Sequence, residues 1–99
     1  MSTKNKIATK CVSGLPFGIG DCVLIRTVTM IQLGRVVEIG EKEIVLEDGG
    51  WVASTVRFGE TLATGKLDEF ERAPSWICVG RGAIVDIYPW NHALPQESK

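Results

Sequence analysis

The feature that most constrains the fold is the stretch from Cys22 to Asp48, CVLIRTVTMIQLGRVVEIGEKEIVLED. β-Branched and aliphatic residues dominate it, and its apolar residues recur at alternate positions and not at helical spacing. Gly34 allows a bend, and the glycine-containing sequences at 40–42 and 48–50 indicate turns. The stretch therefore predicts a curved antiparallel meander, with strands at 21–31, 35–39 and 43–47.

The pattern changes in the middle of the chain. Phe58 and Leu62 lie four residues apart, and Gly65 follows as a C-terminal stop signal. These signals predict one short helix from Phe58 to Thr64. A helix of this length is not stable alone, so it must pack on the sheet through its two apolar residues.

The last third of the chain returns to strand character. The sequence WICVGRGAIVDIY at 76–88 predicts two strands that are joined by a Gly-Arg-Gly turn at 80–82 and ended by Pro89. The acidic segment at 67–72 is predicted to be an edge strand or a loop, because Pro74 prevents its continuation as a central strand.

Length and charge limit the classes of function. A chain of 99 residues makes one domain. We divide it into a Gly/Pro-rich arm at 1–20, a β-domain at 21–90 and a tail at 91–99. The net charge of −1 argues against a dedicated polyanion-binding protein but allows a local basic patch. Several strands are apolar on both faces, so we expect self-association to cover the second face.

No catalytic or metal-binding pattern stands out. Cys11, Cys22 and Cys78 lack CxxC or Cys/His spacing, and the single histidine, His92, has no nearby partner at ligand spacing. We expect reduced cysteines, no cofactor, no metal and no enzymatic activity. No apolar segment is long enough for a signal core or a membrane span, so we expect a cytoplasmic protein.

Two blocks of the sequence resemble the two motifs of the Sm and Lsm family. VLIRTVTMIQLGRVVEIGEKEIVLEDG, at 23–49, is similar to the first motif: a strand, a glycine with an aliphatic residue two positions later, a short turn and an aliphatic strand. ICVGRGAIVDI, at 77–87, is similar to the second motif, with Arg81 and Gly82 at its Arg-Gly position. The nearest likeness is to small stand-alone phage proteins, including cyanophage-type ones, which implies the host cytoplasm.

The resemblance implies an all-β fold, namely a small, strongly bent, five-stranded Sm-like or SH3-like open barrel with the short helix inserted between the two motifs. It also implies a homo-oligomeric ring, in which the last two strands pair edge to edge with neighbouring subunits. Closure of a ring would remove the two unpaired edges of an open barrel. Family members commonly bind single-stranded, uridine-rich RNA at the pore of the ring.

Only one residue of the family's base-binding set carries over to this chain, namely Arg81. The Asp and Asn of the first motif's loop are absent, and Gly40 to Glu43 stand in their place. A guanidinium group can stack on a base or bind a phosphate. The candidate RNA contacts are Arg81, Gly82, Lys42 and Arg35. For Arg81 and Lys42, the alternative of an exposed turn residue stays open.

The candidate subunit interface lies on the last two strands and consists of Ile77, Val79, Ile84 and Trp76. Tryptophans in a small β-domain are more typical of core or interface anchors than of base-stacking platforms. Two functions stay open. One is an RNA-binding ring, and the other is a phage-related structural or assembly ring that binds no nucleic acid. A small-ligand binder that uses the tryptophans is a third alternative.

Overall fold

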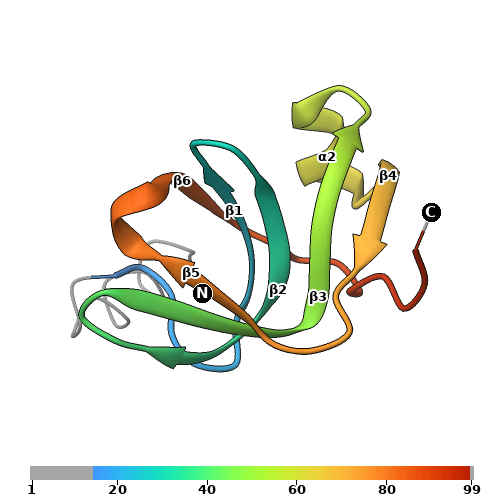
Figure 1. The fold of residues 1–99 in the computed structure, drawn as a ribbon. Helices are drawn as coiled ribbons and strands as arrows, with labels where there is room; N and C mark the ends of the chain where they lie inside the picture. Colours follow the sequence, from blue (N-terminus) through green and yellow to red (C-terminus); the bar gives the residue numbers. More distant parts are fainter. Residues whose placement is uncertain (1–14, 99) are drawn as a thin grey trace, which may run out of the picture.

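The structure is a computed structural model that describes residues 15–98. Most of the predicted arm, including Cys11, lies outside the described residues. Within them, the chain forms one antiparallel sheet with a single short α-helix between its third and fourth strands (Figure 1). The strands are β1 (Cys22–Thr27), β2 (Ile31–Ile39), β3 (Glu43–Thr55), β4 (Leu67–Arg72), β5 (Ile77–Gly80) and β6 (Ile84–Pro89). The all-β class with one short helix is thus confirmed, with a sixth strand formed by the predicted edge segment.

The strand order is β4-β3-β2-β1-β6, and β5 pairs with β3. β3 is long enough to serve two neighbours on one side: its first residues pair with β5, as at Ile44 and Val79, and its last residues pair with β4, as at Val52 and Phe70. Figure 1 shows the sheet curled, with β5 and β6 on one side of the molecule and α2 and β4 on the other.

The turn predicted at 48–50 is wrong, because β3 runs through these residues as an irregular strand. Asp48 has a positive φ of 57°, and Gly49 and Gly50 lie close to neighbouring backbone. A Cβ on Gly49 would stand 1.7 Å from the Leu33 carbonyl oxygen, and one on Gly50 would stand 2.1 Å from that of Glu71. The two glycines therefore bend the strand between its two neighbours and do not end it.

The single strand predicted at 21–31 is also wrong. β1 ends at Thr27, and a tight turn leads into β2 at Ile31. Thr27 closes the turn: its backbone N–H donates to the Met30 carbonyl oxygen at 2.8 Å, and its hydroxyl oxygen accepts from the Met30 N–H at 3.0 Å. The turn residues have strand-favouring side chains, so the sequence carried no turn signal here.

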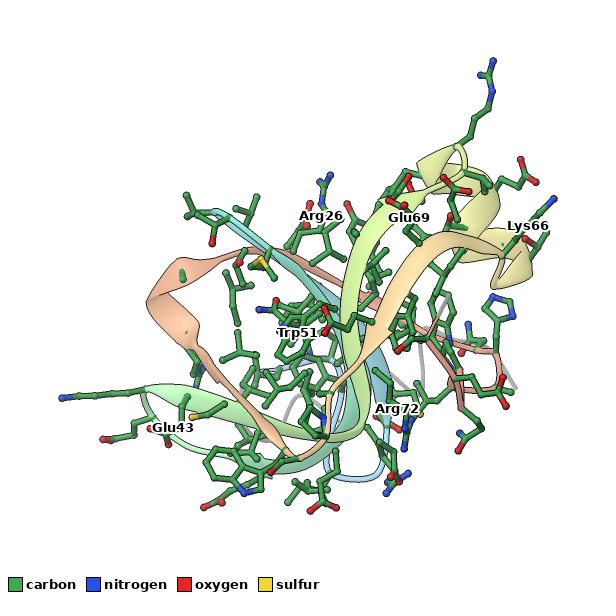
Figure 2. The ribbon with its side chains drawn as sticks, turned by 45° about the vertical axis from the view of Figure 1, so that its right-hand side comes forward. Arg26, Glu43, Trp51, Lys66, Glu69 and Arg72 are labelled. Carbon is green, nitrogen blue, oxygen red and sulfur yellow. The ribbon has the colours of Figure 1, made fainter. Side chains whose placement is uncertain are left out.

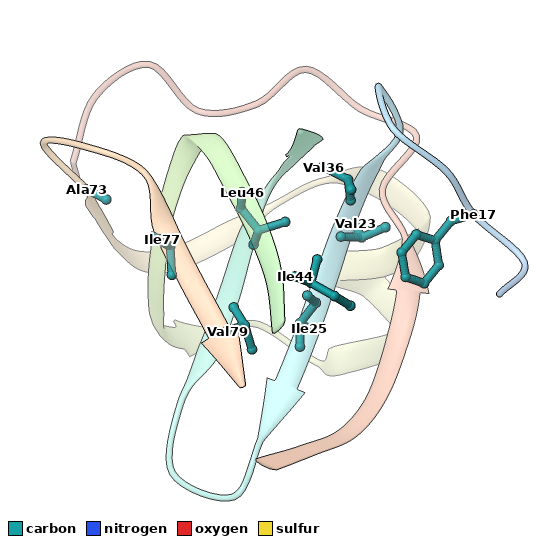
Figure 3. Packing of buried hydrophobic residues seen from close by; sticks show 9 residues of the cluster. All are labelled: Phe17, Val23, Ile25, Val36, Ile44, Leu46, Ala73, Ile77 and Val79. Carbon is teal, nitrogen blue, oxygen red and sulfur yellow. The ribbon is translucent and has the colours of Figure 1, made fainter. Parts of the chain in front are cut away.

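The sheet has a hydrophobic cluster on each face. The inner cluster lies inside the curl (Figure 3) and contains Phe17, Val23, Ile25, Val36, Ile44, Leu46, Ala73, Ile77 and Val79. The outer cluster contains Leu24, Leu33, Val52, Leu67, Phe70 and Trp90. Alternate residues of β1 enter opposite clusters, which explains its two apolar faces. The second face is therefore covered within the chain, whereas the sequence led us to expect self-association there.

The predicted helix is confirmed at the predicted bounds, as α2 (Phe58–Thr64). It ends at Gly65, whose φ of 80° is left-handed and whose N–H donates to the Thr61 carbonyl oxygen. Phe58 and Leu62 pack against the outer cluster, as their spacing predicted. The predicted Gly-Arg-Gly turn takes the form of one 3-10 turn, η2 (Arg81–Ala83), between β5 and β6.

Candidate functional site

The two sequence blocks that suggested RNA binding meet at one end of the sheet. β5 pairs with the start of β3, with Gly80 opposite Glu43, so Arg81 arrives beside the β2–β3 turn. Its backbone N–H donates to the Lys42 carbonyl oxygen at 2.8 Å, and its Nη1 donates to the Gly40 carbonyl oxygen at 2.6 Å. Two turns that lie far apart in the sequence are thereby fixed to each other.

The junction presents a partly accessible cation beside an exposed one. Arg81 is half-buried, and Lys42 and Gly82 are exposed. The bond to Gly40 uses one of the five N–H groups of the guanidinium, so the others can meet a phosphate or a base edge. A Cβ on Gly82 would have no atom within 4 Å, which leaves the turn open to an approaching ligand.

Gly40 belongs to the β2–β3 turn. A Cβ there would stand 1.8 Å from Oε2 of Glu43, which is the end of a flexible side chain. The Gly40 N–H also donates to the Glu43 carbonyl oxygen at 2.8 Å, which closes the turn. The carboxylates of Glu41 and Glu43 flank Lys42 in the sequence and reduce the positive field of this turn.

Arg35, the fourth candidate RNA residue, belongs to a different cluster. Its guanidinium forms a salt bridge with Asp48, which lies 3.6 Å from a guanidinium nitrogen of Arg72. The hydrogen bond that Arg35 donates to Asp48 raises the pKa of Arg35 above its usual value. The structure therefore brings together Arg81, Gly82 and Lys42 and places Arg35 with the acidic bend of β3. Arg35 lies apart from the other three residues because of the register in which the strands pair, and this register cannot be read from the sequence.

The four candidate interface residues differ in how deeply their side chains are buried. Ile77 and Val79 point into the inner cluster and are 8% and 2% exposed. Ile84 is half-buried, whereas Trp76 is 62% exposed. Residues of β5 alternate, so Cys78 points outward between the two buried residues. Trp76 is thus the candidate whose side chain is available to a partner.

Three strands have an unpaired side within residues 15–98, namely β5, β6 and β4, which pairs with β3 alone. β5 pairs with β3 alone, and β6 pairs with β1 alone. Beside β6 lies a groove of about 670 Å³, between that strand and the segment that leads into β1. Its lining includes Phe17, Cys22, Val23, Ile87, Trp90 and Asn91. Burial raises the pKa of the Cys22 thiol, so this cysteine is held in its neutral form.

A polar cluster that the sequence analysis missed connects β1, β6 and α2. Nε of Arg26 donates to Oδ1 of Asp86 at 2.7 Å, and a second nitrogen binds the other carboxylate oxygen. The guanidinium lies 4.8 Å from the ring centroid of Phe58. The Tyr88 hydroxyl donates to Oδ2 of Asp86 at 2.9 Å. The cluster has no sequence signal, since its members are brought together by strand pairing.

Contacts within the cluster shift the pKa values of its members in the directions expected for a hydrogen-bonded ion pair. The Arg26 hydrogen bonds lower the pKa of the Asp86 carboxyl. The same contact raises the pKa of Arg26, and the hydrogen bond to Asp86 raises that of Tyr88. These groups meet one another's hydrogen-bonding needs, which is typical of a cluster that stabilises the fold.

His92 also has a structural contact. Its Nε2 lies 2.8 Å from the Leu62 carbonyl oxygen of α2, and its ring centroid lies 5.1 Å from that of Trp90. Among residues 15–98, no group of three or more His, Cys, Asp or Glu residues is arranged to hold a metal ion.

Two further observations bear on identity. In the part of the chain that the structure describes, no helix is long and apolar enough to cross a membrane. No protein-family model, curated protein or solved structure matches this chain.

Proposed function

We propose that the protein is an Sm-like subunit of a homo-oligomeric ring that binds single-stranded RNA beside Arg81. The observation that carries this proposal is the pair of hydrogen bonds that joins Arg81 to the Gly40–Lys42 turn. The two blocks that resemble Sm motifs thereby present their turns at one place. That is the arrangement that the resemblance implies for an RNA-binding pore.

The strand order supports the Sm-like architecture. Without β4, the order is β5-β3-β2-β1-β6, with a three-residue turn between β5 and β6. This is a five-stranded, strongly bent, open arrangement, and β4 with α2 forms the insertion between the two motifs. The unpaired sides of β5 and β6 supply the edges through which subunits would join.

The chemistry at the junction suits a single strand better than a duplex. One guanidinium and one ammonium group offer few phosphate contacts, and the chain carries a net charge of −1. A guanidinium plane can stack on an unpaired base while its N–H groups bind an edge or a phosphate. Repetition of the junction around a ring would multiply a weak contact into a useful affinity.

The test is the affinity of the purified protein for a fluorescent oligouridine as a function of salt. We expect Arg81→Ala to weaken binding by about tenfold or more, and Lys42→Ala to lower the salt slope by about one. Arg57→Ala is the matched control, since Arg57 is an exposed cation at the start of α2. Absence of binding by the wild-type protein at low salt would overturn the RNA assignment.

A second function, a structural or assembly ring without nucleic acid, is favoured by one specific observation. Trp76 and Val85, which lie in or beside the unpaired strands, are 62% and 63% exposed. Apolar side chains at strand edges favour protein contacts. This alternative predicts a stable oligomer whose assembly and salt response are the same in Arg81→Ala and in the wild type.

A further inference from the structure

Two features of the molecule have no role in the RNA site. One is the exposed indole of Trp76, the residue just before β5, and the other is the groove beside β6. We propose that Trp76 of one subunit inserts into the β6 groove of the next subunit and anchors the assembly. This inference rests on the proposed homo-oligomer and names the contact that would hold it together.

The exposure of Trp76 makes its indole available to a partner. Trp90 is 3% exposed and Trp51 is half-buried, whereas Trp76 stands out from the surface at 62%. The alternation of β5 causes this, because Ile77 and Val79 point inward and their neighbours point outward. A tryptophan is the residue type most enriched among energetic anchors of interfaces, where its large apolar area is removed from water.

The groove has the size and chemistry for an indole. Its volume of about 670 Å³ lies within the range of pockets that hold small organic molecules, roughly 300–1,000 Å³. Phe17, Val23, Ile87 and Trp90 contribute apolar lining. Phe17, which Figure 3 shows beside Val23, belongs to the inner cluster.

The acids in the groove already have partners. Oδ2 of Asp21 accepts the Gly18 N–H at 2.9 Å, and Asp86 is held by Arg26. The lining is therefore suited to an uncharged, aromatic occupant more than to a cationic ligand. β5 matches this requirement, since its sequence ICVG contains no charged residue.

Backbone geometry brings the two features together. β5 and β6 each have one hydrogen-bonded neighbour within the described chain, so each offers a side to a second copy. If β5 pairs antiparallel with β6 of another subunit, the start of β5 lies opposite the end of β6. Trp76 then arrives next to Pro89, Trp90 and Asn91, which line the groove at that end. A second copy of this chain is therefore the occupant that fits.

Such a contact is heterologous, because the anchor and the groove are different surfaces of the same subunit. Each subunit would give its Trp76 to one neighbour and receive the Trp76 of the other. A heterologous contact makes a closed ring when the rotation closes. This property gives the proposal a sharp test.

The experiment uses two full-length variants that each remove one half of the contact. Trp76→Ala removes the anchor, and Asn91→Arg places a long charged side chain in the groove. Native mass spectrometry and sedimentation velocity give the stoichiometry, and circular dichroism checks that each variant is folded. Val28→Ala is the matched control, because Val28 is an exposed apolar residue of the β1–β2 turn that does not line the groove. Its backbone N–H donates to the Ala83 carbonyl oxygen between β5 and β6, and the substitution keeps this bond.

We expect each variant alone to associate at least about 30-fold more weakly than the wild type, with Trp76→Phe retaining most of the association. Val28→Ala should assemble as the wild type does. An equimolar mixture of Trp76→Ala and Asn91→Arg should form a dimer and nothing larger, because one intact anchor and one intact groove remain between the two variants.

The failures of the two proposals are distinguishable. A wild-type oligomer that persists in Trp76→Ala overturns the anchor and leaves the ring standing. Loss of assembly in Asn91→Arg alone, with Trp76→Ala unaffected, means that another segment fills the groove and also overturns the anchor. A monomeric wild-type protein overturns the ring and the anchor together.

Discussion

The exposed sides of β4 and β5 are built in opposite ways. β4 has the sequence LDEFER, with four charged residues among six, whereas β5 has the sequence ICVG and no charge. Figure 2 shows Glu69 and Arg72 among the side chains of β4. Charged residues on an edge strand discourage pairing with another chain, and an apolar edge permits it.

The end of the chain further closes the β4 side. The Arg72 N–H donates to the Ser98 hydroxyl oxygen at 2.8 Å, and the Arg72 guanidinium donates to the Pro95 carbonyl oxygen at 3.0 Å. Residues near the C-terminus thus occupy one end of β4. The β4 edge is thus charged and contacted at Arg72 by residues near the C-terminus, whereas β5 offers an uncharged edge to a partner.

Among the variants that test the difference between β4 and β5, Phe70→Ala is expected to have the largest effect on stability. Phe70 is the inward anchor of β4 and is almost fully buried in the outer cluster. Its truncation should lower the free energy of unfolding by about 3–5 kcal/mol. The stoichiometry of the protein that stays folded should not change, because the proposed assembly joins β5 to β6 and does not involve β4. Urea unfolding followed by sedimentation of the folded fraction measures both quantities.

Glu69→Ala is the control for that experiment, since Glu69 is exposed on the same strand. It should change stability by no more than about 0.5 kcal/mol. A changed stoichiometry in folded Phe70→Ala protein would contradict the closed character of the β4 side.

A smaller but more selective effect is expected from Cys78→Lys. Cys78 is the exposed residue in the middle of β5. A lysine there leaves the monomer core untouched, but it places an unpaired charge where a second copy would pair. Association should weaken by at least about 30-fold. Glu69→Lys on β4 is the matched variant and should assemble normally; equal effects of the two lysines would erase the distinction between the strands.

The smallest effect concerns the single charge on β6. Because Arg26 lowers the pKa of Asp86, the ion pair stabilises the fold above the unfolded-state pKa of about 3.9. This contribution is lost as the pH falls through the lower folded-state pKa. Asp86→Asn should therefore remove part of the acid-induced loss of stability. Urea midpoints between about pH 2 and pH 7 test this, and identical pH profiles for variant and wild type would contradict it.

The parts of the fold that local chemistry determines could be predicted from the sequence. The spacing of Phe58 and Leu62 and the left-handed Gly65 specify α2 without reference to the sheet. Features that depend on distant pairing could not be predicted. The glycines at 49 and 50 look like a turn locally, and only the approach of Leu33 and Glu71 makes them a bend within β3.

The candidate site divides in the same way. Arg81 and Lys42 were found through their turns, and β3–β5 pairing then joins them. Arg35 was grouped with them because of its position in a motif. In the structure, the strand register places it beside Asp48, with which it forms a salt bridge. The groove beside β6 had no sequence signal, because it forms only where the segment around Phe17 packs against the sheet.

We propose that β5 and β6 are the joining edges of a ring. The decisive experiment is a native mass spectrum of the freshly purified full-length protein at low salt. We expect one closed stoichiometry above the monomer, with RNA retained on the wild-type oligomer. A monomer at every protein concentration would contradict it.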